Sequence, residues 1–86
     1  YVPGSNSRAL EKARTLPCDV LIIDLEDAVA PEAKLAARDQ AAAAVGSGGF
    51  AAAEVVIRVN GLDTEWGRDD LAAASIAQPS AILLPK

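Results

Sequence analysis

Short runs of apolar residues alternate along the chain with longer stretches in which apolar positions recur at helical spacing. The runs cover residues 19–25, 54–60 and 80–84, and each is rich in branched side chains. Nearly continuous apolar runs of this length are typical of strands that are buried on both faces, as in a parallel sheet. Tyr1 and Val2, just before a Pro-Gly pair, have the pattern of the end of one more strand. The pattern therefore predicts four strands.

Three helices are expected between these strands. Residues 7–16 place apolar side chains three or four positions apart. A second helix is expected to begin at Pro31, where the missing N–H costs nothing, and to end at Val45 before a glycine-rich segment. A third is expected over residues 64–77, with Pro79 as its stop. Strands that alternate with helices predict βαβ units, a parallel sheet and right-handed crossovers.

The order β-α-β-α-β-α-β places the chain in the α/β class and leaves two architectures open. It is either half of a closed barrel or a small open sheet, such as a flavodoxin-like binding module. An open sheet of this size would leave two bare edges, and half a barrel would expose its apolar interior. Both predict further sequence or a partner chain, and the abrupt ends at Tyr1, without a methionine, and at Lys86 favour the same expectation. We therefore expect residues 1–86 to form part of one larger domain.

Composition and charge exclude several classes of protein. Apolar residues make up 51% and charged residues 23%, as in globular chains. The net charge is −4 and the basic residues are scattered, so nucleic acid is not an expected partner. No apolar run approaches the ~20 residues that span a membrane, and no signal peptide is visible, so no membrane partner is expected either. Cys18 is the single cysteine and histidine is absent, so an internal disulfide and a Cys/His metal site are both excluded. A single cysteine fits a reducing, cytoplasmic compartment, and a packing role is favoured for Cys18.

Polar residues at the carboxyl ends of the expected strands are the candidates for chemistry, because parallel α/β folds bind ligands there. Asp24, Glu26 and Asp27 follow the second strand, with Asp24 and Glu26 on one face if the extended backbone continues. Clustered carboxylates can hold Mg²⁺ directly or through water, or can belong to a solvated or helix-capping loop. Arg58 lies in the third strand, which ends at Asn60. A charge inside a strand needs a partner, and both a structural ion pair with Glu26 or Asp27 and a bidentate contact to a substrate carboxylate stay open.

The loop after the first strand is a weaker candidate. Residues 4–7, Gly-Ser-Asn-Ser, open a helix, so their N–H groups could bind a phosphate or simply cap the helix. Arg8 and Lys12 lie one helical turn apart and could contact an anionic cofactor or form a solvated face. The chain has no Walker, G-x-G-x-x-G, H-E-x-x-H or G-x-S-x-G motif, so ordinary nucleotide-binding, zinc-protease and hydrolase interpretations lack support.

Four short motifs follow one another along the chain. They are YVPGSN with LEKA in residues 1–13, DLEDAVAP with a following lysine and Ala-Arg in residues 24–38, IRVNGLDT in residues 57–64, and LLPK in residues 83–86. Their order and spacing resemble those of the citrate lyase β-subunit-like family, within the HpcH/HpaI aldolase superfamily, over essentially the whole chain. That family includes the citryl-CoA lyase component of citrate lyase, malyl-CoA and methylmalyl-CoA lyases, and malyl-CoA thioesterases.

The resemblance implies that residues 1–86 are the N-terminal half of a (β/α)8 TIM barrel that forms homo-oligomers, as trimers or hexamers. It implies a Mg²⁺-dependent lyase that cleaves a C–C bond of citryl-CoA or malyl-CoA type and releases a 2-oxo acid and an acyl-CoA. A malyl-CoA-type thioesterase is the alternative within the family, and a non-catalytic half-barrel remnant or assembly module is the alternative outside it. The residues leave open which acyl group is used, and whether CoA or an acyl-carrier protein carries it.

The resemblance also implies roles for individual residues. Arg58 matches the arginine that binds the carboxylate or carbonyl of the substrate and helps to stabilise developing charge. Tyr1 and Lys12 match positions near the acyl-CoA. Asn6 stands where the lyases carry a basic residue, and the nearby Arg8 is expected to substitute for it.

The implied magnesium site is incomplete in this chain. Glu26 and Asp27, with Asn60 beside them, match residues that act on the metal through water or through its ligands. The direct ligands, a Glu and an Asp, are expected from later strands, beyond residue 86. Residues 1–86 alone are therefore not expected to hold Mg²⁺ properly or to catalyse.

Overall fold

A computed structural model describes residues 1–85 and shows one parallel sheet of four strands. The strands are β1 (Val2–Pro3), β2 (Val20–Asp24), β3 (Glu54–Arg58) and β4 (Ala81–Leu83). They lie side by side in chain order, and every neighbouring pair is parallel. The predicted parallel sheet is confirmed, although β2, β3 and β4 are each shorter than the apolar run that forms them. Lys86, the last residue of the fourth motif, lies outside the described residues.

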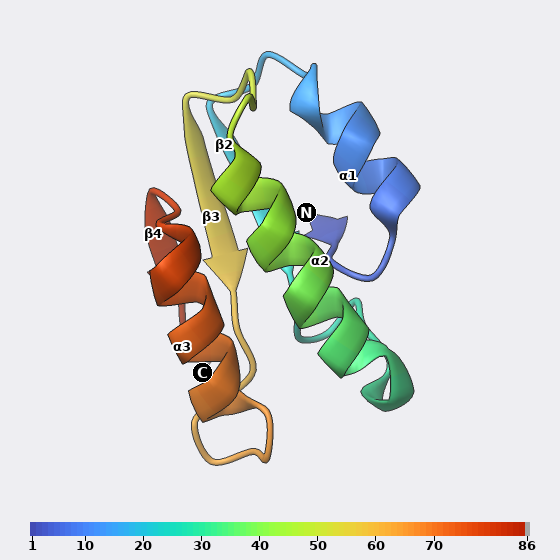
Figure 1. The fold of residues 1–86 in the computed structure, drawn as a ribbon, viewed down its shortest axis with the longest axis vertical. Helices are drawn as coiled ribbons and strands as arrows, with labels where there is room; N and C mark the ends of the chain where they lie inside the picture. The colour runs from blue at the N-terminus through green and yellow to red at the C-terminus, as the bar shows by residue number, and fades with distance from the viewer. Residues whose placement is uncertain (86) are drawn as a thin grey trace.

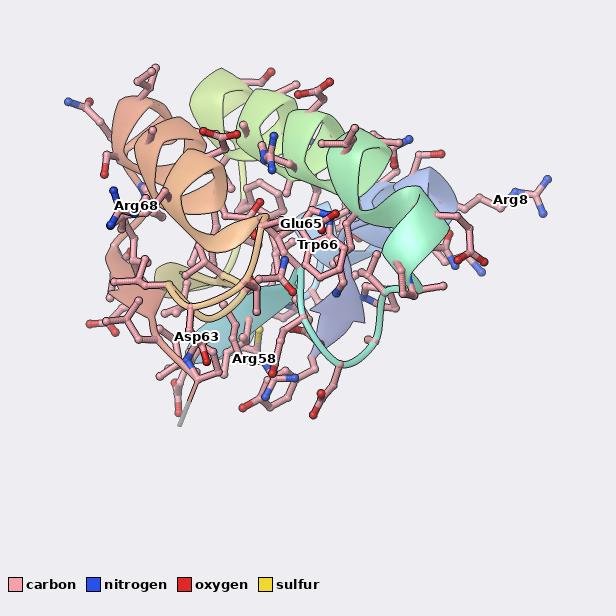
Figure 2. The ribbon with its side chains drawn as sticks, turned by 90° about the horizontal axis from the view of Figure 1, so that it is seen from below. Arg8, Arg58, Asp63, Glu65, Trp66 and Arg68 are labelled. Carbon is pink, nitrogen blue, oxygen red and sulfur yellow. The ribbon has the colours of Figure 1, made fainter. Side chains whose placement is uncertain are left out.

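Three helices connect the strands, and they all pack on the same side of the sheet. They are α1 (Ser7–Arg14), α2 (Lys34–Ser47), which follows a 3-10 turn η1 (Pro31–Ala33), and α3 (Gly67–Ala77). Figure 1 shows the three helices in front of the sheet, and Figure 2 shows them above it, with the opposite face bare. Sequential parallel strands with all helices on one side form the repeating unit of a (β/α)8 barrel, whereas a flavodoxin-like sheet carries helices on both faces. The α/β partial-barrel prediction is therefore confirmed.

The ends of the helices differ from the expected ones by a few residues. The first helix stops at Arg14, because Thr15 closes the last turn with a side-chain hydrogen bond of 3.1 Å and Pro17 disfavours helical backbone in the residue before it. Pro31 starts the 3-10 turn rather than α2 itself. The third helix begins late because a turn precedes it, closed by the N–H of Thr64.

The hydrophobic core lies between the sheet and the helices. Side chains that alternate along β2 and β3 and their C-terminal extensions point into it, and they meet small and branched side chains of the helices. The strand residues are Ile23, Leu25, Ile57 and Val59, and the helix residues are Leu10, Ala37, Ala41, Ala44, Val45 and Ala74. The intervening strand residues Ile22 and Val56 lie in register on the helix-free face and are only partly buried. Within residues 1–85 no element covers the second face, as expected for part of a barrel whose apolar interior is exposed.

The loop between β3 and α3 is held tightly against the start of α3. A Cβ atom at Gly67 would overlap the carbonyl of Gly61 and lie 2.8 Å from the Cα atom of Leu62. Only glycine allows this approach. The loop is thereby fixed at the carboxyl end of the sheet, where the candidate site lies.

Two smaller expectations concern Cys18 and membrane spans. Cys18 is a free thiol and is half-buried, so it is less completely packed than expected. Among the helices of residues 1–85, none has the length and apolar character needed to cross a bilayer.

Candidate functional site

Arg58 and Asp24 form the centre of the site at the carboxyl ends of β3 and β2. The two residues are partners in the strand register, so their side chains emerge next to each other on the helix-free face. Arg58 donates from Nε to Oδ1 of Asp24 and from Nη2 to Oδ2, both at 2.8 Å. Asp24 is 1% exposed, and the Arg58 side chain is 19% exposed. The arrangement is a bidentate guanidinium–carboxylate pair, which fixes the plane of the guanidinium.

The Asp24 carboxylate also organises the backbone that follows β2. It accepts hydrogen bonds from the N–H of Glu26 (2.9 Å) and of Ala28 (2.8 Å). The backbone therefore turns after Asp24 and does not extend, so strand alternation no longer decides where Glu26 points. Burial works to raise the pKa of Asp24, but the hydrogen bonds from Arg58 and from the two N–H groups outweigh it and hold that pKa below its ordinary value. Both members of the pair are charged, because the hydrogen bonds that Arg58 donates to Asp24 also raise the pKa of Arg58.

Glu26 and Asp27 are looser partners of Arg58 than the sequence suggested. An Oε1 atom of Glu26 lies 3.6 Å from Nε, and an Oδ2 atom of Asp27 lies 4.0 Å from Nη2. The structural ion pair of Arg58 thus exists, but its main partner is Asp24, which corrects the expectation of Glu26 or Asp27. Nη1 of Arg58 has no hydrogen-bond partner within residues 1–85. The same guanidinium can therefore keep its structural pair and offer a free end to a ligand.

Arg58 also lines a cavity at the carboxyl edge of the sheet. The cavity has a volume of about 440 Å³ and is lined by Glu26, Asp27, Arg58, Leu83, Leu84 and Pro85. A neighbouring hollow of about 350 Å³ shares Leu84 and Pro85 and is bordered by the β3–α3 loop at Asp63. One wall is therefore charged and the other apolar, which is the usual composition of a small-molecule site.

Tyr1 is the one expected substrate contact outside the strand ends that the structure brings to Arg58. Its ring is 70% exposed, and its centroid lies 4.7 Å from Cζ of Arg58, a cation–π distance. Asn6 instead caps α1, because its Oδ1 atom accepts from the N–H of Ala9 at 3.0 Å. Arg8 and Lys12 are exposed on α1, and Arg8 points outward, away from both the molecule and Arg58 (Figure 2). Their substrate-binding roles stay predictions.

Asn60 joins a buried polar network behind the site. Its Nδ2 donates to the carbonyl of Leu25 (2.9 Å) and to Oδ2 of Asp70 (2.5 Å), and its backbone N–H donates to the same oxygen (3.1 Å). Arg38 completes the network with a 2.7 Å contact from Nε to Oδ1 of Asp70, which is fully buried. Sequence reasoning placed a helix over residues 64–77 but missed this role of Asp70. Its i, i+4 spacing from the buried Ala74 is the signal that could have revealed it.

The carboxylates at the strand ends are the groups to compare with the ligand needs of a metal ion. Residues 1–85 contain no group of three or more His, Cys, Asp or Glu side chains placed to hold a metal ion. The oxygens of Asp24 are already occupied by Arg58 and two N–H groups, whereas Glu26 and Asp27 carry carboxylates of the kind Mg²⁺ prefers at the rim of the cavity. These residues fit an outer role, through water, better than direct coordination.

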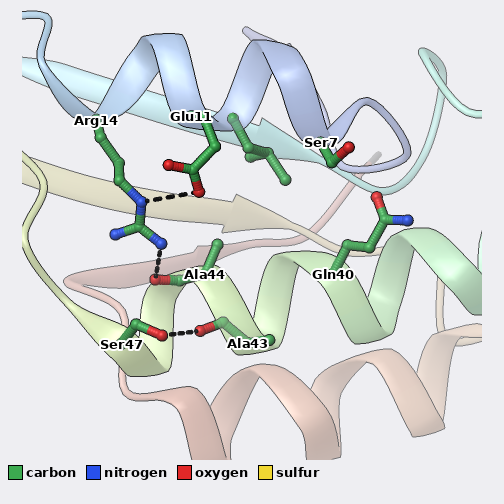
Figure 3. A pocket seen from close by; sticks show the side chains of 8 residues that line it. Ser7, Glu11, Arg14, Gln40, Ala43, Ala44 and Ser47 are labelled. Carbon is green, nitrogen blue, oxygen red and sulfur yellow. Dashed lines mark hydrogen bonds and ion pairs between the residues drawn. The ribbon is translucent and has the colours of Figure 1, made fainter.

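A further hollow lies between α1 and α2 (Figure 3). Several of its polar side chains are already paired: Arg14 donates to Oε1 of Glu11 (3.2 Å) and to the carbonyl of Ala44 (3.3 Å), and Ser47 donates to the carbonyl of Ala43 (2.8 Å). These contacts link the two helices and close the last turn of α2. They leave no charged group of this hollow aimed at a ligand.

Comparisons with known proteins agree with the geometry. The family model for HpcH/HpaI aldolase/citrate lyase matches residues 1–86. A (3S)-malyl-CoA thioesterase of Cereibacter sphaeroides (strain ATCC 17025) is 49% identical over 86 residues, which are 100% of this chain and 30% of that protein. Citrate lyase subunit beta of Escherichia coli (strain K12) is 37% identical over 100% of this chain and 28% of that subunit. The crystal structure of RipC from Yersinia pestis matches with a TM-score of 0.69 and 31% identity, over 99% of this chain and 32% of that chain. The chain thus spans less than a third of the length of these relatives.

Proposed function

The chain belongs to the HpcH/HpaI aldolase/citrate lyase family, and on this premise we propose that it supplies the first strands of a barrel enzyme acting on a malyl-CoA-type thioester. Hydrolysis of the thioester is the activity we favour, because the identity to a (3S)-malyl-CoA thioesterase is 49%, against 37% to a citrate lyase subunit beta. Carbon–carbon cleavage is the second candidate, supported by that citrate lyase likeness over the whole chain. Both activities use a substrate with a free carboxylate.

The observation that carries the proposal is the free end of Arg58. Asp24 holds one edge of the guanidinium, so that Nη1 remains for an anionic group in the cavity. A fixed, permanently charged fork recognises a carboxylate with little loss of side-chain entropy. Arg58 therefore binds and orients the free carboxylate or the 2-oxo group of the substrate.

The charges around Arg58 support a cationic cofactor. Three carboxylates, those of Asp24, Glu26 and Asp27, lie within 4.0 Å of one guanidinium, which leaves two negative charges uncompensated. An anionic substrate would be repelled at this edge without added positive charge. A Mg²⁺ ion, when bound through ligands outside residues 1–86, supplies that charge and polarises substrate oxygens. Glu26 and Asp27 would hold its water ligands, and Arg58 would hold the substrate's carboxylate.

Product analysis distinguishes the two activities. The full-length protein is incubated with malyl-CoA in two parallel reactions, one containing MgCl₂ and the other containing EDTA. Hydrolysis adds water across the thioester and yields malate and free CoA, whereas carbon–carbon cleavage yields glyoxylate and acetyl-CoA. We expect free CoA and malate with Mg²⁺ and neither with EDTA. Glyoxylate and acetyl-CoA would select the lyase, and citryl-CoA then serves as the second substrate. No turnover of either thioester would contradict the proposal and favour the non-catalytic remnant.

A further inference from the structure

Lys34 is a buried ammonium group that the site described above does not use. It is the first residue of α2 and is 6% exposed. It forms no ion pair with any carboxylate of residues 1–85. Burying a charge without a counter-charge is costly unless hydrogen bonds replace the lost water. A methionine would fill a similar volume at a lower cost, so packing alone gives no reason for a lysine here.

The hydrogen bonds of Lys34 go to the backbone that directly follows β2. Its Nζ donates to the carbonyl of Leu25 (3.2 Å) and to the carbonyl of Glu26 (2.9 Å). The ring of Trp66, just before α3, covers the ammonium with its centroid 5.2 Å from Nζ. Asn60 adds a second donor to the Leu25 carbonyl. Lys34 of α2 and Asn60, just after β3, therefore converge on the carbonyls of these two residues, while Trp66 covers the ammonium that reaches them.

This arrangement holds Glu26 from both sides. Its N–H donates to Oδ1 of Asp24 at 2.9 Å, and its carbonyl accepts from Lys34 at 2.9 Å. With both peptide groups fixed, the direction in which the Glu26 side chain leaves the backbone is fixed as well. That side chain reaches the rim of the cavity, with Oε1 at 3.6 Å from Nε of Arg58.

We propose that Lys34 is a positioning residue, which sets the Glu26 carboxylate beside Arg58 by holding the carbonyls of Leu25 and Glu26. It touches neither substrate nor cavity and acts only through Glu26. The proposal rests on the proposed function in one respect, since the effect on turnover requires that the full-length protein be an enzyme. Its structural part, the restraint of residues 25 and 26, is independent of any activity.

A double-mutant cycle in the full-length protein tests the route through Glu26. The variants are Lys34→Met, Glu26→Gln and their combination, and kcat/KM is measured with malyl-CoA. We expect Lys34→Met to lower kcat/KM about tenfold in the wild-type background and less than about twofold in the Glu26→Gln background, because coupled residues are not additive. Val45→Ala is the matched control, since it removes a buried side chain near the other end of the same helix, away from the carbonyls of Leu25 and Glu26. It should lower kcat/KM by the same factor in both backgrounds. An equal effect of Lys34→Met in the two backgrounds overturns the proposal.

Amide hydrogen exchange provides the readout that does not depend on turnover. The N–H groups of Glu26 and Ala28 should exchange at least about tenfold faster in Lys34→Met than in wild type or Val45→Ala, because the turn that protects them is released. Equal exchange in Lys34→Met and Val45→Ala overturns the proposal. If the full-length protein turns over neither malyl-CoA nor citryl-CoA, the proposed function fails. The amide exchange rates of the two variants still test whether Lys34 restrains residues 25 and 26. If Lys34→Met does not fold, Lys34→Gln takes its place in both measurements, with the same expected outcomes.

Discussion

Asp24 and Arg58 occupy partner positions in the register of β2 and β3 and are joined by two hydrogen bonds of 2.8 Å each. The pair ties two strand ends together and orients the guanidinium toward a cavity. The carboxylate is buried, while the arginine keeps a free end. One contact therefore serves both the fold and the proposed chemistry, and substitutions of the two partners should have different consequences.

Arg58→Lys should lower kcat/KM at least about tenfold in the full-length protein with the fold retained, because lysine keeps the charge but loses the planar fork. Steady-state kinetics with malyl-CoA and far-UV circular dichroism measure the two parts of this expectation. Arg68→Lys, at an exposed position of α3, is the matched control and should be silent. Unchanged kinetics in Arg58→Lys would contradict the substrate-binding role of Arg58 and leave it only the structural ion pair with Asp24.

Asp24→Asn should destabilise the fold by about 2–4 kcal/mol, because it leaves the partly buried guanidinium without its main counter-charge and weakens two backbone contacts. The free energy of unfolding from urea titration measures the loss. The exposed Asp19→Asn, just before β2, should change it by less than about 0.5 kcal/mol. A loss as small as that of the control would show that the pair does not stabilise the strand ends.

The Asp24 pair also predicts an acid dependence of stability. The folded-state pKa of Asp24 lies below its ordinary value of 3.8, so the unfolded chain binds more protons in the interval between the two pKa values. Its contribution is therefore fully present above pH about 4 and is lost as the pH falls through the folded-state pKa. Thermal unfolding between pH 2 and pH 7, compared between wild type and Asp24→Asn, measures this. The difference in melting temperature between the two proteins should shrink at the acid end, and a constant difference would contradict the assignment.

Asp70→Asn should destabilise the fold by about 2–4 kcal/mol, because this fully buried carboxylate accepts from Arg38 and from both donors of Asn60. Asp69 is exposed, so Asp69→Asn makes the same chemical change as Asp70→Asn at a solvent-facing position and serves as the control. Chemical denaturation of the two variants side by side measures the difference. Similar stabilities would mean that the network adds little to the fold.

Gly67→Ala and Gly46→Ala should have opposite effects on stability. At Gly67 the added methyl group overlaps the Gly61 carbonyl, so we expect a loss of at least about 2 kcal/mol. At Gly46, inside α2, the methyl group meets open space and alanine favours the helix, so we expect a gain of about 0.5–1 kcal/mol. Melting temperatures measured in the same buffer compare the two. A tolerated Gly67→Ala would contradict the close approach of the loop.

Several residues of the candidate site could be predicted from the sequence. Arg58 stood out because a charge inside an apolar strand needs a partner, and Glu26 and Asp27 because they follow a buried strand. Tyr1 was placed near the substrate by resemblance alone, and the structure sets its ring against Arg58. Asn60 was expected near a metal, and the structure places its side-chain donors in a buried network.

The sequence by itself determined the kind and order of the elements, because hydrophobic periodicity and helix stops are local properties of the chain. Tertiary structure decided which acid pairs with Arg58, since the choice of Asp24 follows from the register between β2 and β3, whose partners lie 34 residues apart. It also decided the buried hydrogen bonds beneath the site, from Lys34 to the Glu26 carbonyl and from Arg38 and Asn60 to Asp70. Each of these pairs meets only after the helices pack onto the sheet. Local patterns set what each segment becomes, and long-range contacts set which side chains meet.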